Sequence, residues 1–253
     1  MQKALFSELY KMMHKGSFKI QTFIIAITPV IFALIANYAL DKKSTSDFMN
    51  NLGGGNYILA VFSIIYASSI LVEEFQYNTI KTCLSRGTAR FSFYVNKYLG
   101  LIIQFLFWYL IVIASVFINW VIFYRSKITW GGDVGFIHQL RLSFFGDLIM
   151  MLLIFSLLLL ISNFIKNTSI SAVIGLVAFL MNFSINDLIM SLYDKFHWVK
   201  WNPLNMLSAS SQMADHSFID LTHLSTSLLV LGSLIYTIIF LALGSILFKQ
   251  RQL

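Results

Sequence analysis

The sequence predicts an all-α membrane protein with six transmembrane helices, an amphipathic helix before the first span and a short cytoplasmic helix between the second and third spans. Of its 253 residues, 58% are hydrophobic and only 11% are charged, and the mean hydropathy is +0.76. A soluble domain carries about 25% charged residues, so this chain has too few to cover a surface that faces water. With 13 Gly, 2 Pro and 1 Cys, the collagen-like, disordered and disulfide-stabilised classes are excluded as well. We expect two parts, the interfacial helix at 1–19 and a single transmembrane domain at 20–253.

Six apolar segments predict the transmembrane helices, because a helix needs about 20 mostly apolar residues to cross ~30 Å of hydrocarbon. The segments are 20–40, 57–72, 99–124, 144–164, 170–192 and 224–248. The second is short and becomes long enough when it is extended through Gly54 and Gly55. The fourth and fifth each contain one aspartate, Asp147 and Asp187, and both are expected near the outer ends of their spans.

An even number of spans places both termini on one side, and the basic residues indicate which side that is. With the termini inside, the cytoplasmic segments carry eleven Lys and Arg residues and the outer loops carry seven. Cytoplasmic segments of membrane proteins hold the excess of positive charge. We therefore predict a multi-pass protein of the cell membrane with both termini cytoplasmic. This sorting explains the net charge of +7 without a nucleic-acid partner.

Motifs for catalysis are missing from the sequence. A P-loop needs Gly before its Lys-Ser/Thr pair, whereas the two such pairs here, at 43–44 and 81–82, follow Lys42 and Ile80. The five histidines are scattered, so no metal site is expected. Glu-Glu at 73–74 lacks the Arg that one type of intramembrane protease requires four residues later. We predict that the chain is not an enzyme and binds no metal or cofactor of its own.

The first amphipathic feature lies at 5–17. Apolar residues recur there at spacings of three and four, opposite a polar face that includes Glu8 and Lys11. The apolar positions are Leu5, Phe6, Leu9, Met12 and Met13. This pattern predicts a helix that lies in the cytoplasmic interface of the membrane. It serves either as a plain basic anchor or as a lever that a partner moves.

The polar segment 73–97 separates the second span from the third. Asn78 or Thr79 can cap a short helix there, and Gly87 can end it. One face of that helix is apolar and consists of Tyr77, Ile80 and Leu84. An apolar face on a cytoplasmic helix is typical of a segment that docks in a groove of another protein. The alternative is an ordinary solvated loop with basic anchors.

Polar residues follow one face of the fifth span, at Asn182, Asn186 and Asp187. Polar groups inside a membrane are costly, so this stripe predicts a substrate pathway or a subunit interface. Interhelical hydrogen bonds worth ~0.6 kcal/mol each are the alternative. The segment that follows, 198–203, is rich in Trp and broken by Pro203, which predicts short interfacial helices before the last span.

Two of these segments resemble the permease subunits of ABC-2-type ABC exporters. The first carries Glu8-Leu9-Tyr10-Lys11 in its amphipathic helix. The second begins with Glu73-Glu74, continues through Asn78-Thr79-Ile80-Lys81 and Leu84-Ser85-Arg86, and ends with Arg90 and 94–97. Within that group the chain is most similar to small permeases of lantibiotic and bacteriocin self-protection and of cytolytic-peptide export in Gram-positive bacteria.

The resemblance implies that separate ABC ATPase subunits, two of them, bind ATP and Mg²⁺ and that 73–97 forms the coupling helix and its flanks. The residues that it assigns to ATPase coupling are Glu73, Glu74, Thr79, Ile80, Leu84, Arg86 and Arg90. It further implies a bacterial cell membrane and a second permease subunit, identical or different. The implied substrate is amphipathic or hydrophobic, such as an antimicrobial or cytolytic peptide, and is exported.

Two other functions stay open. An ion-coupled transporter or channel subunit would need no ATPase, and it predicts titratable residues at mid-membrane and inverted repeats. The sequence offers one or two marginal acids and no evident repeat. A scaffold or sensor without transport predicts that 73–97 tolerates substitution.

The predicted topology is open to a direct test. A membrane-impermeant reagent applied to intact cells should label position 42 and leave position 81 unlabelled, because the first lies in an outer loop and the second in a cytoplasmic one. Epitopes at both termini should be protected in the same cells. Labelling of position 81 and not of position 42 would reverse the assignment.

Overall fold

The computed structural model describes residues 2–39, 52–77, 80, 89–119, 121–122, 136–165, 167–193 and 198–250. Within these ranges, the description leaves out the side chains of 2–4, 37, 136 and 182–193. The described residues form helices and turns and contain no strand, so the predicted all-α class is confirmed. The long helices are α1 (Gln2–His14), α2 (Gly16–Ala39), α4 (Gly55–Gln76), α6 (Arg90–Asn119), α7 (Phe136–Ile161), α8 (Thr168–Tyr193) and α12 (Thr226–Gln250).

Five of the described helical segments are long and apolar enough to cross a membrane. They are Gly16–Ala36, Leu52–Gln76, Arg90–Asn119, Ile137–Ile161 and Thr226–Gln250. In α8 the apolar portion is shorter, at Thr168–Met181. The chain is thus a polytopic membrane protein, and each of the six predicted spans corresponds to a helix in the order expected from hydropathy.

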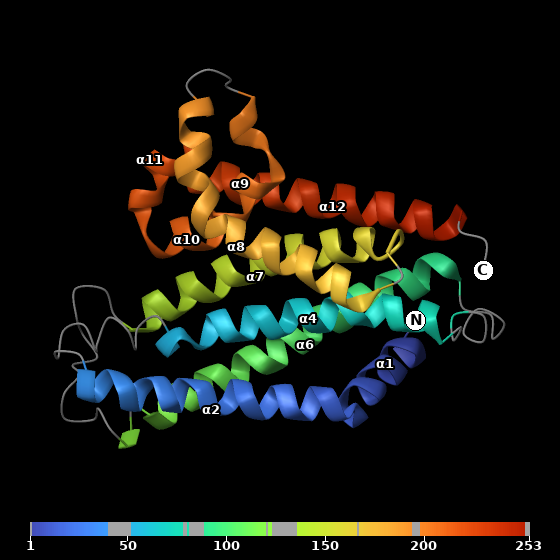
Figure 1. Cartoon of the computed structure of the whole chain (residues 1–253), viewed down its shortest axis with the longest axis horizontal. Helices are drawn as coiled ribbons and strands as arrows, with labels where there is room; N and C mark the ends of the chain where they lie inside the picture. The colour runs from blue at the N-terminus through green and yellow to red at the C-terminus, as the bar shows by residue number, and fades with distance from the viewer. Residues whose placement is uncertain are drawn as a thin grey trace.

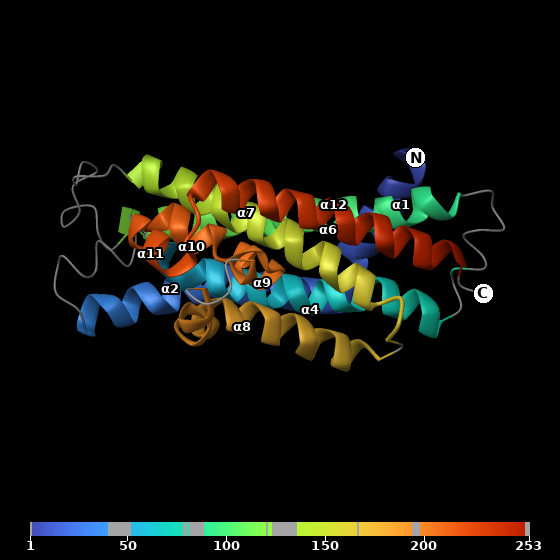
Figure 2. The ribbon, with the colours of Figure 1, turned by 90° about the horizontal axis from the view of Figure 1, so that it is seen from above.

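The long helices after α1 run side by side as a bundle, with α1 at an angle to them (Figures 1 and 2). Both termini lie at the same end of the bundle, as an even number of crossings requires (Figure 1). This end, called the terminal end below, also holds the last turns of α4 and α12 and the first turns of α6. Short helices gather toward the opposite end.

The short helices fill the connection between α8 and α12, as predicted from the Trp and Pro residues there. They are η3 (Val199–Trp201), α9 (Pro203–Leu207), α10 (Ala209–Ala214), η4 (His216–Phe218) and α11 (Ile219–Thr222). Pro203 occupies the first turn of α9, where its missing N–H costs nothing, and the Asn202 side chain caps that helix by accepting from Asn205 N at 2.8 Å. The Asp215 carboxylate accepts from the Ser217 backbone N–H, which lowers the pKa of that carboxyl.

The boundaries around the second and third spans differ from those predicted. Helix α4 continues through Glu73 and Glu74 to Gln76, and α6 already begins at Arg90. The predicted polar connection at 73–97 is therefore too long at both ends. Charged residues mark the end of an apolar segment in the sequence, but here the helix extends because Lys11, Lys15 and Lys97 neutralise those charges.

A buried aromatic group joins the first three spans in the middle of the bundle. The Trp108 side chain in α6 is fully buried and stacks on Phe18 of α2 at 5.2 Å between ring centroids. Tyr66 of α4 meets the same indole edge-on at 6.1 Å. Trp108 Nε1 donates to Thr22 Oγ1 at 2.9 Å, so the polar end of the indole is satisfied inside the membrane domain.

Helix α10 packs tightly against α7 because Gly146 has no side chain. A Cβ added at Gly146 would lie 2.9 Å from Ser210 Cα and 3.2 Å from the Ser210 carbonyl oxygen. Backbone atoms cannot move aside as a flexible side chain can. Small residues allow this close approach of helices in membranes, where the hydrophobic effect does not drive helix association.

We therefore expect Gly146→Ala to destabilise the protein despite the higher helix propensity of alanine. Overpacking against a backbone costs about 1–3 kcal/mol, and the measurement is the unfolding temperature of the purified chain in detergent. Gly100→Ala is the matched control, since a Cβ at that buried helical glycine meets nothing within 4 Å. A drop in unfolding temperature of similar size for both variants would contradict the explanation.

Candidate functional site

The inner face of α1 carries a charged residue among apolar ones. Met12 is buried, and Leu5, Glu8 and Leu9 are partly buried, at the three- and four-residue spacing of one helical face. Phe6 and Met13 are exposed, at 74% and 46%, so they do not belong to this buried face. Glu8 was expected on the opposite polar face but points into the protein.

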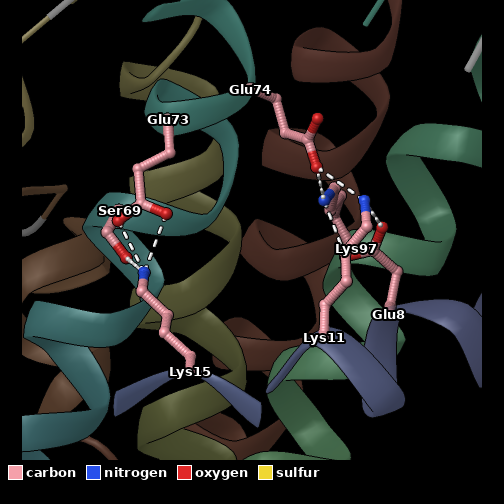
Figure 3. A network of polar contacts seen from close by, with 7 residues as sticks. All are labelled: Glu8, Lys11, Lys15, Ser69, Glu73, Glu74 and Lys97. Carbon is pink, nitrogen blue, oxygen red and sulfur yellow. Dashed lines mark hydrogen bonds and ion pairs between the residues drawn. The ribbon is translucent and has the colours of Figure 1, made fainter. Parts of the chain in front are cut away.

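Glu8 points inward because it pairs with a buried lysine of another helix. The Lys97 side chain in α6 is only 2% exposed, and its Nζ lies 2.7 Å from Glu8 Oε2 and 2.7 Å from Glu74 Oε1 (Figure 3). Lys11 Nζ lies 3.3 Å from the same oxygen of Glu74 and 3.5 Å from Glu8 Oε1. Two lysines and two glutamates from α1, α4 and α6 thus form one network, called the Lys97 network below.

A second ion pair, one helical turn further along, ties α4 to Lys15, the residue between α1 and α2. Lys15 Nζ contacts both carboxylate oxygens of Glu73, at 2.6 and 2.7 Å, and Ser69 Oγ at 3.4 Å (Figure 3). The ammonium also lies 5.7 Å from the centroid of the Tyr66 ring. Both side chains of this pair are about one third exposed, so the pair is weaker than the buried network.

The burial of Lys97 decides how strongly the network holds the three helices. An ammonium removed from water is costly unless it is paired and its donors are used. Lys97 Nζ has two carboxylate acceptors and lies 5.2 Å from the centroid of the Phe93 ring. Loss of one partner from a buried ion pair costs about 3–5 kcal/mol, so α1 and α4 cannot move away from α6 separately without a large penalty.

The last turn of α12 joins the same end of the bundle through aromatic packing and a helix cap. The Phe248 side chain is fully buried and stacks on Phe93 at 5.7 Å between centroids. Arg90 Nη1 donates to the Lys249 carbonyl oxygen at 2.6 Å, which satisfies a backbone acceptor at the end of α12. Arg90, expected to flank the coupling helix, therefore anchors the start of α6 to α12.

The structure brings together four residues that the sequence singled out, namely Glu8, Lys11, Glu73 and Glu74. Thr79, Leu84 and Arg86 lie outside the described residues. Ile80 is 1% exposed and belongs to the hydrophobic core of this chain, whereas Tyr77 is 74% exposed. The prediction that Tyr77 and Ile80 share one outward apolar face is therefore wrong.

Lys15 and Lys97 complete the site, and sequence reasoning missed both. Lys97 ends the segment 94–97 that carries part of the family resemblance, but the sequence predicts no coupling role for it. A usable signal exists: Glu8, Lys11 and Lys15 recur at spacings of three and four, so that charges of both signs share one stripe that begins on α1 and ends at the residue after it. Such a stripe predicts opposite charges on whatever the helix lies against.

The other polar residues singled out by the sequence lie away from this end. Asn182, Asn186 and Asp187 belong to α8, but their side chains are outside the description, so their predicted role in a pathway or interface stays a prediction. Asp147 was expected to reach the outer interface. It is instead buried, at 7% exposure, and its Oδ1 accepts from Ser210 Oγ of α10 at 2.6 Å.

The fold and the charged end define an all-helical, polytopic membrane protein with α1 bound to two of its spans. A family model described as "ABC-2 family transporter protein" matches residues 4–182, which is more than half of the chain. The chain therefore belongs to the ABC-2 transporter family. A comparison with curated proteins gives no match. Membership makes the chain a permease of the ABC type and implies an ABC ATPase as partner.

We expect Lys97→Met to destabilise the protein strongly, because it leaves the buried carboxylates of Glu8 and Glu74 with too little positive charge. The expected loss is about 3–5 kcal/mol, measured as a lower unfolding temperature in detergent. Lys15→Met is the matched control, since it removes the same charge from the partly exposed pair, and should cost about 1 kcal/mol or less.

A second variant separates charge from packing in this test. Lys97→Met combined with Glu74→Gln removes one charge of each sign, so it should recover part of the stability lost in Lys97→Met alone. Equal losses for Lys97→Met and Lys15→Met, or no recovery in the combined variant, would show that the ion pairs do not hold α1 in place.

Proposed function

We propose that this chain is the membrane subunit of an exporter in which separate ATPases supply the energy. The observation that carries the proposal is the Lys97 network, which holds α1, α4 and α6 together at the end of the bundle where the predicted coupling segment lies. In this proposal that end faces the cytoplasm, the chain hydrolyses no ATP itself, and ATP and Mg²⁺ are bound by the ATPase subunits.

The network gives the coupling a physical basis. The segment between α4 and α6, residues 77–89, begins three residues after Glu74 and ends eight residues before Lys97. A push on this segment reaches both helices, and the ion pairs carry α1 with them. Such a push does work only if the ATPase contacts the inward and outward states of the permease with different free energies.

The substrate in this proposal is an amphipathic or hydrophobic molecule, an antimicrobial or cytolytic peptide in the first instance. The likeness to small Gram-positive peptide-export permeases supports this class, together with a chain rich in Phe and Met, whose side chains adapt to varied apolar surfaces. We also propose that two permease subunits and two ATPases form the complete exporter in a bacterial cell membrane.

The test is recovery of an ATPase with the tagged chain. We expect the chain, extracted from membranes in mild detergent, to copurify with a protein that is photolabelled by 8-azido-ATP. Leu84→Asp should lower that recovery at least tenfold, because a charge would be forced into the proposed docking groove. Ile219→Asp is the control, since it places the same change at an exposed apolar residue of α11, outside the coupling segment.

Transport then distinguishes the proposed function from its alternatives. Vesicles that contain the chain and its ATPase should accumulate a fluorescent amphipathic peptide only when ATP is present. Movement of ions or peptide by the purified chain without nucleotide or companion protein would favour an ion-coupled transporter or channel. Full ATPase recovery with Leu84→Asp would show that 73–97 is not the docking segment.

A further inference from the structure

A small polar cavity lies among α4, α7, α8 and α10, well away from the Lys97 network. Its volume is about 70 Å³, enough for a few small groups but not for a whole peptide. Residues of four helices line it, including Asn56 and Tyr57 of α4, Asp147 of α7 and Ser210 of α10. None of the described lining residues is basic.

The cavity presents hydrogen-bond acceptors that have no donor. Asp147 is more than nine-tenths buried, and one of its carboxylate oxygens, Oδ1, accepts from Ser210 Oγ at 2.6 Å. The other oxygen, Oδ2, is buried without a partner among the described residues, and so is Asn56 Oδ1. Buried acceptors without donors are rare in folded proteins, because each forfeits its hydration without compensation.

The position of the carboxylate is built into the packing of α7. Gly146 lets the backbone of Ser210 approach α7, and this approach brings the Ser210 hydroxyl onto Asp147 Oδ1. Oδ1 is thereby occupied, and Oδ2 is left for something that enters the cavity. The site thus has a fixed geometry instead of a carboxylate free to turn.

We propose that this cavity binds a primary ammonium group, as carried by a lysine side chain, a peptide N-terminus or an aminoethyl headgroup. An ammonium has three donors and no acceptor. It therefore suits a lining in which one carboxylate oxygen and one amide oxygen have no hydrogen-bond donor among the described residues. Its charge would be paired by Asp147 out of water, where charge-assisted hydrogen bonds are strongest. Tyr57 and Phe179, which also line the cavity, are aromatic residues of the kind that attract cations.

A divalent metal ion fits the same residues less well. Calcium takes six to eight oxygen ligands and usually several carboxylates, whereas Asp147 is the single carboxylate among the described lining residues. An anion is opposed by the same carboxylate. The inference does not depend on ATP-driven export, since it concerns only what the cavity holds.

The test measures the unfolding temperature of the purified full chain in phosphatidylcholine nanodiscs with increasing propylammonium chloride. We expect a saturable upward shift of about 2–4 °C, the size that a weak ligand produces in a chain of this length at several times its Kd. Tetramethylammonium chloride has the same charge but no N–H donors, and it should give no such shift. Equal responses to the two salts, or no response to either, would overturn the proposal.

Variants then locate the response. Asp147→Asn should abolish the shift, and Asp220→Asn, which removes the same charge from the exposed surface of α11, should keep it. Asn56→Leu leaves the carboxylate but removes the whole amide, both its acceptor oxygen and the N–H donors that interact with Asp147. It should therefore change the apparent affinity for propylammonium several-fold even if Asp147→Asn fails to fold. A full shift in Asn56→Leu and Asp147→Asn would place the amine elsewhere and overturn the proposal.

Lipid composition identifies the source of the ammonium group. In nanodiscs of phosphatidylethanolamine, a chain that is already stabilised and no longer responds to propylammonium would show that the headgroup fills the cavity. A response that is unchanged in those discs would assign the cavity to a solute. Both results support ammonium binding. The comparison of propylammonium with tetramethylammonium and the Asp147 and Asn56 variants are the experiments that can refute it.

Discussion

The burial of one ammonium group constrains the whole terminal end of the protein. Lys97 is 2% exposed, and its ammonium is paired with one carboxylate from α1 and one from α4, while Lys11 supplies the second positive charge. Apolar helices gain little from contact with each other in lipid, because lipid tails are as apolar as their side chains. The mutual placement of α1, α4 and α6 therefore depends on satisfying a charge, in addition to the packing around Trp108 and Phe248.

The charged groups are paired to different extents at the two ends of the bundle. At the terminal end, every glutamate of the network faces a lysine within ion-pair distance, and no described carboxylate of that network lacks a cation. Around Asp147, in contrast, two buried acceptor oxygens have no partner among the described residues, and a cavity lies beside them. Satisfied charges favour rigidity, whereas unsatisfied ones favour a ligand. The first region suits the transmission of a movement and the second suits recognition.

Hydropathy was sufficient to predict the order of the helices and the short helices around Pro203, because both follow from local composition. Hydropathy failed to predict helix ends and burial where a tertiary contact pairs a charged residue. Glu73 and Glu74 look like the end of a span, yet α4 continues past them because Lys11, Lys15 and Lys97 neutralise them. Asp147 looks like an interfacial residue, yet a glycine on α7 brings a hydroxyl to it inside the bundle. Neither partner is near in sequence, so no local pattern reveals the pairing.

One helix contributes to both regions. Helix α4 carries Asn56 and Tyr57 at its first turn and Glu73 and Glu74 at its last, and its 22 residues span about 33 Å at 1.5 Å per residue. Asn56 lines the cavity beside Asp147, while Glu74 belongs to the Lys97 network. A ligand that binds one arrangement of the cavity would therefore favour one position of α4. An ATPase that favours one placement of the terminal end would act on the position of the same helix. By linkage, occupancy at either end would then alter the affinity at the other, with no chain of intermediate residues needed beyond the helix itself.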